Sequence, residues 1–407
     1  MSATTSTEVV ANSALVRDDL LALVERRALY VGAGAAVICA LGWLIDSAGF
    51  YRAYLWGYVY WLNIALGLVG WLLLQNLAGG RWSVAIIDVL SSGARTLKWL
   101  AQLFLPIALG IPSLYRWAQP AEVAASELLQ HKQPYLNTSF FLGRAAGYFA
   151  LWIVLAWLLN RWAVPLAQRG DDDTTRRIQR TGAIGLIAVA VTVSLAMVDW
   201  IMSLEPEWYS TIYGLIFVAG DMLAGMAFAL LLSGFQDRRA QLVAPPGTAA
   251  APLVRPDQYN DLGNLMLASV MAWAYLVFSQ YLINYSGNTL EEIPWHLRRT
   301  RGAWGAVAIL LIVFHFALPF VLLLIRDIKR DASRLAAVAG LVLVVQLLAL
   351  AWIVKPAFGA GQGFSWLDPF ALSAVGGLWL SRFLGQYRRQ LALTRGDSPA
   401  FSSEAQP

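Results

Sequence analysis

Long apolar runs separated by short polar connections dominate the chain. A helix needs about 20 apolar residues to cross the hydrocarbon core of a membrane. Ten runs approach or exceed that length: 28–48, 54–76, 84–112, 139–161, 181–203, 208–233, 260–284, 303–325, 334–355 and 366–386. The pattern predicts an all-α integral membrane protein with about ten transmembrane helices.

The third run is the least regular, because Asp88, Arg95 and Lys98 interrupt it. We still expect it to cross. With ten crossings both termini lie on one side, and the loops on that side hold most of the 30 Lys and Arg residues. Cytoplasmic loops carry such an excess, so both termini are predicted to be cytoplasmic.

The runs divide the chain into two transmembrane halves. The predicted parts are a cytoplasmic N-terminal segment (1–27), a first half with six spans (28–233), an Ala/Pro-rich cytoplasmic linker (234–259), a second half (260–386) and a cytoplasmic tail (387–407). The first twenty residues have neither a cationic start nor a short apolar core, so we expect no removable signal peptide. None of the extramembrane parts is large enough for a catalytic domain.

Composition supports the membrane assignment and narrows the possible chemistry. Hydrophobic residues make up 58% of the chain and charged residues 14%, whereas soluble proteins average about 25% charged. In this setting the net charge of +5 gives no sign of nucleic-acid binding. Cys39 is the single cysteine and His131, His296 and His315 are the only histidines. We therefore expect no metal site, and no haem or iron–sulfur cluster bound by this chain.

Asp221 is the deepest acid in the pattern, near the middle of the run 208–233. A charged side chain at the bilayer centre costs on the order of 2.5–3.5 kcal/mol. Gly220 and Gly225 beside it favour close packing against another helix. We expect Asp221 to carry protons; the alternative is a structural carboxylate bonded to a neighbouring side chain.

Asp88 and Arg95 are seven residues apart and share one helix face. Such a stripe either lines a hydrated interior or pairs with acids on other helices. The first pair we expect is Arg95 with Asp221.

A proton path is predicted from the polar residues of the spans. It would run from Asn264 near the cytoplasmic face, by way of Asp88, Asp221 and His315, toward Asp199 and Asp46 near the outer face, with Arg95 beside it. His315 suits a relay because imidazole titrates near neutrality, although a buried histidine bonded to a backbone carbonyl is the alternative. Glu205 and Glu207 are expected only to cap helices or meet water.

The predicted outer loop contains His131 close to Lys132, Tyr135 and Asn137. A histidine with a phenol, here His131 with Tyr135, could hold a quinone carbonyl. An ordinary interfacial belt of polar and aromatic residues is the alternative.

Several stretches together resemble a known family. They are DWIMSLEPEWYSTIYG (199–214), NDLGNLMLASVMAWAYLVFSQYLINYSGN (260–288), EEIPWHLRR (291–299) and HFALPFVLLLIRDIKR (315–330). They are similar to the F subunits of alternative complex III, a bacterial quinol:electron-acceptor oxidoreductase. These subunits belong to the wider polysulfide-reductase, or NrfD-like, membrane family. The similarity covers nearly the whole chain, including the HKxxYLN element at 131–137.

The resemblance implies a ten-helix subunit without a cofactor of its own, built around two four-helix bundles with two additional helices, in a bacterial plasma membrane. It implies partners: an iron–sulfur protein, the NrfD-like C subunit, multihaem and monohaem cytochromes c, and small membrane anchors. Haem c and iron–sulfur clusters would then belong to the partners. We expect a non-catalytic or proton-conducting subunit; the alternatives are a subunit that itself binds menaquinol and a stand-alone secondary transporter.

Overall fold

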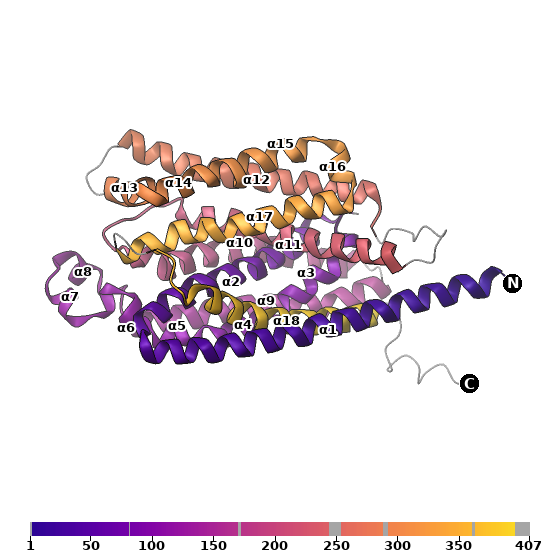
Figure 1. Ribbon diagram of the computed structural model, residues 1–407, viewed down its shortest axis with the longest axis horizontal. Coiled ribbons are helices and arrows are strands. Elements are labelled where there is room, and N and C mark those ends of the chain that lie inside the picture. The colour runs from indigo at the N-terminus through magenta and orange to yellow at the C-terminus, as the bar shows by residue number, and fades with distance from the viewer. Residues whose placement is uncertain are drawn as a thin grey trace.

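A computed structural model describes residues 2–80, 82–169, 172–243, 254–287, 292–359 and 363–394. Every regular element in these ranges is a helix, and none of the residues in them forms a strand. The protein is therefore all-α, as the apolar runs predict. Its long helices lie side by side along one axis (Figure 1).

Within the described ranges, eight helical segments are long and apolar enough to cross a membrane. They belong to α1 (Ser2–Ile45), α2 (Ser47–Ala78), α9 (Thr138–Arg169), α10 (Asp172–Trp200), α11 (Tyr213–Val243), α12 (Pro256–Gly287), the α14–η4–α15 series (Gly302–Leu311, Ile312–Ala317, Leu318–Leu324) and α17 (Ala332–Val354). Each contains most of a predicted run. The predicted run 366–386 corresponds to α18 (Asp368–Thr394), which is equally long but is not one of the eight.

The predicted third span is not one helix, which corrects the expectation for 84–112. The chain forms a series of short helices: η1 (Trp82–Ala85), α3 (Ile87–Ala94), α4 (Leu97–Leu103), α5 (Leu105–Leu109) and α6 (Ile111–Leu114). Pro106 and Pro112 lie in the first turns of α5 and α6. Because proline has no backbone N–H, it is tolerated in a first turn but ends the helix before it. Apolar composition predicted the segment but not these breaks.

Tyrosines of α2 satisfy backbone groups beside one of these breaks. The hydroxyls of Tyr54 and Tyr58 donate to the carbonyl oxygens of Leu103 and Leu100, at 2.8 and 2.9 Å. Backbone polar groups inside a membrane need such partners when a helix is interrupted. The hydrogen bonds therefore make a broken segment compatible with a buried position.

The broken segment runs antiparallel to α2 along most of its length. Gly93 packs against Leu68, near the end of α2, and Gly110 packs against Tyr51, near its start. The chain therefore returns along α2 and reaches the opposite end, as a crossing segment must. The alternation of directions that ten crossings require is preserved.

Contacts group the helices into two four-helix bundles. One contains α2, the broken segment, α9 and α10; the other contains α11, α12, the α14–η4–α15 series and α17. The two bundles meet where α2 packs against α11. The additional helices α1 and α18 pack against each other and against α2. This arrangement agrees with the predicted two bundles plus two helices.

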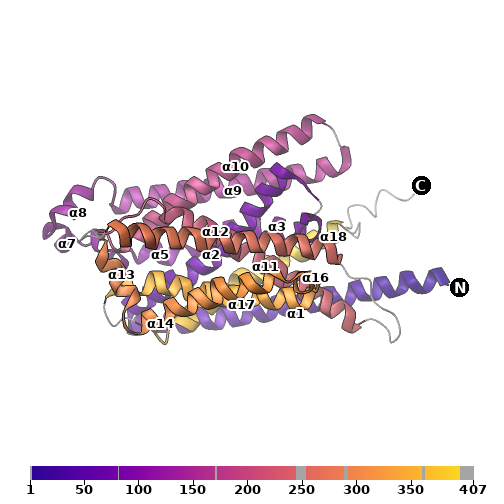
Figure 2. The same cartoon turned by 90° about the horizontal axis from the view of Figure 1, so that it is seen from above.

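The two ends of the molecule differ. Both views show the start of α1 and the end of α18 at one end, here called the terminal end (Figures 1 and 2). The opposite end, here called the α8 end, carries α7 (Pro120–Ala124), α8 (Glu127–Lys132) and α13 (Ile293–Thr300). The sequence predicts that the terminal end is cytoplasmic.

Helices continue across the predicted boundaries between the five parts of the chain. The predicted linker 234–259 is in part helical, because α11 continues to Val243 and α12 begins at Pro256; residues 244–253 lie outside the described ranges. The predicted segment 1–27 is not separate from the first span, since α1 is continuous from Ser2. Of the predicted tail, 387–394 continues α18, and the remaining residues lie outside the described ranges.

Candidate functional site

Four polar side chains are buried on different helices with side-chain atoms that have no hydrogen-bond partner among the described residues. We call this set the buried polar layer. Its members are Asn63 on α2, Asp221 on α11, His315 on η4 and Gln346 on α17. Asp221 is the acid among them: it is 3% exposed and neither carboxylate oxygen accepts a hydrogen bond.

Small residues bring α2 and α11 into direct backbone contact at Asp221. A Cβ atom on Gly67 would collide with the Asp221 carbonyl oxygen and would lie 2.9 Å from the Gly225 nitrogen. One turn farther along α2, the Trp71 indole N–H donates to the Met222 carbonyl oxygen at 2.7 Å. The predicted helix–helix seam is therefore present. Asn63 precedes Gly67 by four residues, so it lies on the same face of α2.

His315 lies in a short π-helix, η4, where the predicted run 303–325 departs from α-helical geometry. Pro319, four residues later, has no N–H to donate to the His315 carbonyl, which explains the local change of hydrogen bonding. Such π-helical turns occur frequently at functional sites. The ring is 0% exposed and meets the Trp273 ring edge-on, with centroids 4.1 Å apart.

Gln346 connects the His315 region to α11. Its amide nitrogen is 3.1 Å from the position that a Cβ on Gly220 would occupy, and Trp273 also borders this position. The His315 ring interacts with the Gln346 side chain. However, neither ring nitrogen nor the Gln346 Oε1 atom makes a hydrogen bond of good geometry.

The predicted pair Arg95–Asp221 is wrong. The Arg95 Nε atom donates to the Asn160 side-chain oxygen on α9, at 2.9 Å. Asp88, seven residues before Arg95, interacts with it electrostatically, which fits the predicted shared face. Arg95 therefore belongs to the bundle of α2 and α9, and Asp221 has no cation partner among the described residues.

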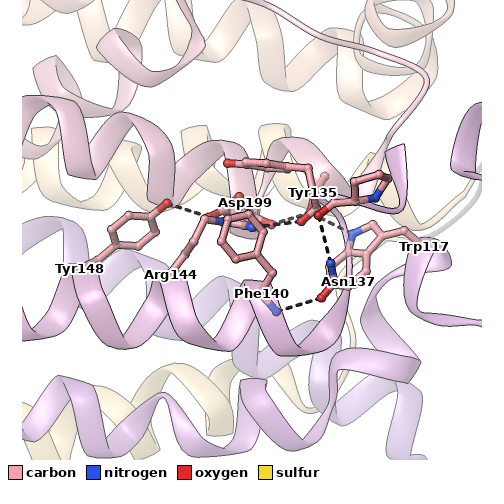
Figure 3. A network of polar contacts seen from close by, with 9 residues as sticks. Trp117, Tyr135, Asn137, Phe140, Arg144, Tyr148 and Asp199 are labelled. Carbon is pink, nitrogen blue, oxygen red and sulfur yellow. Dashed lines mark hydrogen bonds and ion pairs between the residues drawn. The ribbon is translucent and has the colours of Figure 1, made fainter. Parts of the chain in front are cut away.

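At the α8 end, Asp199 is 0% exposed and fully paired (Figure 3). Arg144 of α9 donates to it from Nε at 2.8 Å and from Nη2 at 2.9 Å. The Tyr148 hydroxyl donates a third hydrogen bond at 2.9 Å. Two parallel N–H···O hydrogen bonds of this bidentate kind fix the geometry of the pair.

The start of α9 positions Arg144. The Asn137 side chain accepts a hydrogen bond from the Phe140 N–H at 2.9 Å, which caps the helix. The Arg144 guanidinium group then lies over the rings of Tyr135 and Phe140, 3.9 and 4.3 Å from their centroids. Stacking on aromatic faces suits its planar guanidinium group. Burial and the nearby Asp199 raise the pKa of Tyr135 to about 12, so its phenol stays neutral.

Glu205 does not simply meet water, which corrects another prediction. It is buried and pairs with Arg298 at 3.0 Å and with Arg299, both on α13. Arg299 also donates to the Ile353 carbonyl oxygen at 2.7 Å and lies over the Trp295 ring. Glu207, in contrast, is exposed and pairs with exposed Arg116 at 2.6 Å.

His296, on α13, ends a chain of polar contacts at the same end. Ser210 donates to Gln280, Gln280 donates to Asn284 at 3.1 Å, and the Asn284 amide nitrogen lies 2.6 Å from the His296 Nε2 atom. Burial, together with the charge of Arg299, lowers the pKa of His296 to about 4. The ring is therefore neutral at physiological pH.

The remaining predicted site residues belong neither to the buried polar layer nor to the ion pairs of Asp199 and Glu205. Asp46 is an exposed helix cap that accepts a hydrogen bond from the Gly49 N–H at 2.8 Å. Asn264 is exposed and accepts from Lys329 at 2.6 Å. His131 is exposed on α8, and it does not line the cavity of about 280 Å³ that Tyr135 borders. The predicted quinone pair is thus not brought together at that cavity.

No group of three or more His, Cys, Asp and Glu side chains in the described ranges is placed to hold a metal ion. Chemically, Asp221 and His315 are the titratable members of the buried polar layer, whereas Asp199 and Glu205 are held by arginines. Sequence reasoning missed Asn63 and Gln346, whose amides resemble ordinary interior polar residues. Sequence reasoning also missed the ion pair between Arg144 and Asp199, although a signal for it was available. An arginine inside a membrane span usually pairs with an acid, and Asp199 is near the matching end of the next span.

Comparisons with known proteins identify no relative: no protein-family model matches the chain, and no curated protein matches it. The resemblance to the F subunits of alternative complex III therefore stays a prediction. The structure itself contributes eight helical segments, within the described ranges, that are long and apolar enough to cross a membrane.

Proposed function

We propose that this chain is a membrane-embedded subunit of a quinol-oxidising electron-transfer complex, where it contributes scaffold and moves protons through the buried polar layer. The observation that carries the proposal is Asp221, a carboxylate in the bundle interior with no cation and no hydrogen-bond donor among the described residues. An unpaired charge in such surroundings costs several kcal/mol. A group kept there without a structural partner suits a proton carrier.

The neighbours of Asp221 support this role. His315 and Gln346 bring polar atoms from two other helices to the region of Gly220 and Trp273. The resemblance of residues 199–214 and 260–330 to the F subunits of alternative complex III supplies the redox partner that would drive the movement. The haem and iron–sulfur cofactors would lie in partner subunits of a bacterial plasma membrane.

The path differs from the one predicted by sequence. Asp199 contributes to scaffold in this proposal, because Arg144 and Tyr148 occupy its carboxylate. Asp46, as an exposed cap, contributes only helix stability. Proton movement would depend on Asp221 with His315 and Gln346.

The test is the variant Asp221→Asn in the intact complex, with quinol oxidation and proton release per electron measured separately. We expect electron transfer to continue and proton release to fall to the amount that quinol chemistry alone provides. The matched control is Asp331→Asn at the exposed cap of α17, where asparagine caps equally well. Unchanged proton release in Asp221→Asn would make the carboxylate structural.

Membership of a complex is tested independently by purification in mild detergent. We expect haem-bearing partners to remain with the chain. A chain that purifies alone and moves a solute in vesicles would instead support the secondary-transporter alternative.

A further inference from the structure

A cavity of about 280 Å³ at the α8 end has no part in the proposed proton movement. It lies between the α8–α9 connection and the connection from α10 to α11. Its lining residues are Lys132, Tyr135, Leu136, Val198, Met202, Ser203, Pro206, Trp208 and Tyr209. Small-molecule pockets commonly measure roughly 300–1,000 Å³, so this volume suits a head group rather than a large ligand.

The cavity contains a positive charge without a carboxylate partner. The Lys132 ammonium group donates to the Pro206 carbonyl oxygen at 2.6 Å and has no ion pair among the described residues. An ammonium group has three donors, so one hydrogen bond leaves it able to bind more acceptors. The neighbouring arginines differ, since Arg116 and Arg144 are both paired with acids.

Trp208 forms a fixed wall of the cavity. Its side chain is 4% exposed, and its indole nitrogen is enclosed by protein, so the ring presents its apolar atoms to the cavity. The ring is held in place by stacking on Trp295, with centroids 4.3 Å apart.

The other lining residues favour an amphipathic ligand. Leu136, Val198 and Met202 are apolar, while the rings of Tyr135 and Tyr209 are exposed at the cavity. Aromatic rings with polar tips gather at the depth of lipid head groups. No carboxylate or imidazole lines the cavity, so it offers no base to receive protons from a quinol.

We propose that this cavity binds the phosphate head group of a phospholipid, with the Lys132 ammonium group as donor to the phosphate oxygens and Trp208 as a rigid wall. A full positive charge favours an anionic phosphate over a neutral quinone carbonyl. The apolar walls favour a lipid over free phosphate, because they cover the glycerol and the first methylenes of the acyl chains.

The test uses the full chain, delipidated in detergent and titrated with phosphatidylglycerol, with bound lipid counted by native mass spectrometry. We expect one saturable site. Lys132→Gln keeps a donor for Pro206 but removes the charge and should weaken binding about tenfold or more. Trp208→Phe keeps the stacked ring and removes only a nitrogen that the protein encloses, so it should leave binding unchanged.

Lys329→Gln is the matched control, because Lys329 also donates to a neutral oxygen at 2.6 Å but lies at the terminal end. It should bind phosphatidylglycerol as the wild type does. Circular dichroism shows whether each variant is folded. If Lys132→Gln fails to fold, wild-type protein titrated with diacylglycerol of the same chains decides: binding equal to that of phosphatidylglycerol would overturn the proposal.

Three further ligands separate the possible occupants. Diacylglycerol with the same chains, which has no phosphate, should bind at least about tenfold more weakly than phosphatidylglycerol. Equal binding of diacylglycerol would mean a site for acyl chains only. Equal binding of menaquinone would mean a quinone site, and equal binding of glycerol 3-phosphate would mean a site for soluble phosphates; each of these results would overturn the proposal.

Discussion

Buried acids at the α8 end form ion pairs, whereas the buried acid in the membrane interior forms none among the described residues. Asp199 and Glu205 at the α8 end accept hydrogen bonds from arginines. Lys355 and Asp368, also buried, form a pair of their own. Asp221 in the interior is equally buried but has no partner among the described residues.

The difference shows that burial alone does not indicate what an acid does. A paired buried carboxylate fixes helices relative to each other, and its removal exposes the partner's charge. An unpaired buried carboxylate does not fix helices relative to each other, so a role other than scaffold must explain its presence. The comparison therefore separates scaffold acids from the acid that we propose carries protons.

The strongest test of the scaffold side is Arg144→Ala. This change leaves Asp199 buried without a cation, which costs about 3–5 kcal/mol. The free energy of unfolding in detergent measures it. The control is Arg116→Ala, which breaks exposed pairs with Glu122 and Glu207 and should cost at most about 1 kcal/mol. Similar losses for the two variants would contradict the assignment of Asp199 to scaffold.

Substituting the two acids themselves compares the regions directly. Asp199→Asn removes the negative charge and replaces one of the two acceptor oxygens of Arg144 with an NH2 group, so it should cost roughly 2–3 kcal/mol, the range for hydrogen bonds to charged groups. Asp221→Asn breaks no described hydrogen bond and replaces an unpaired buried acid with a neutral amide, so it should not lower the free energy of unfolding. The same unfolding measurement applies to both. A large loss in Asp221→Asn would reveal a structural partner and remove the contrast.

Gly67→Ala tests whether the interior depends on close backbone packing at Asp221. The added Cβ would collide with the Asp221 carbonyl oxygen, and overpacking costs roughly 1–3 kcal/mol. Gly143→Ala is the control, because no atom lies within 4 Å of the added Cβ. Alanine there should be neutral or stabilise by up to about 1 kcal/mol. Equal effects of the two changes would show that α2 and α11 can separate freely.

The pH dependence of stability gives the smallest effect and concerns the α8 end. The folded state lowers the pKa of His296 to about 4 from an ordinary 6.5. The unfolded chain therefore binds a proton below pH 6.5 that the folded chain does not, and stability falls as pH drops from 6.5 toward 4. Thermal unfolding at pH 7.5 and pH 5 should show a smaller fall in His296→Gln than in the wild type. An identical fall would mean that other groups account for it.

Hydropathy by itself predicted which segments form long apolar helices. Eight segments match predicted apolar runs because the free energy of burying a helix in lipid is nearly a sum over its own residues. The same reasoning predicted that Asp221 lies on a helix–helix seam, from its glycine neighbours. It did not predict the breaks between 84 and 112, since the tyrosines that compensate them come from α2.

Only the tertiary structure decided which charged group meets which. Arg95 pairs with Asn160 rather than Asp221, and Glu205 meets Arg299 from a segment 94 residues away. An ion pair acts over a few ångströms, so it depends on which helices are neighbours and how each is rotated. The packing of the whole bundle sets which helices are neighbours and how each is rotated, so no local stretch of sequence predicts the pairs.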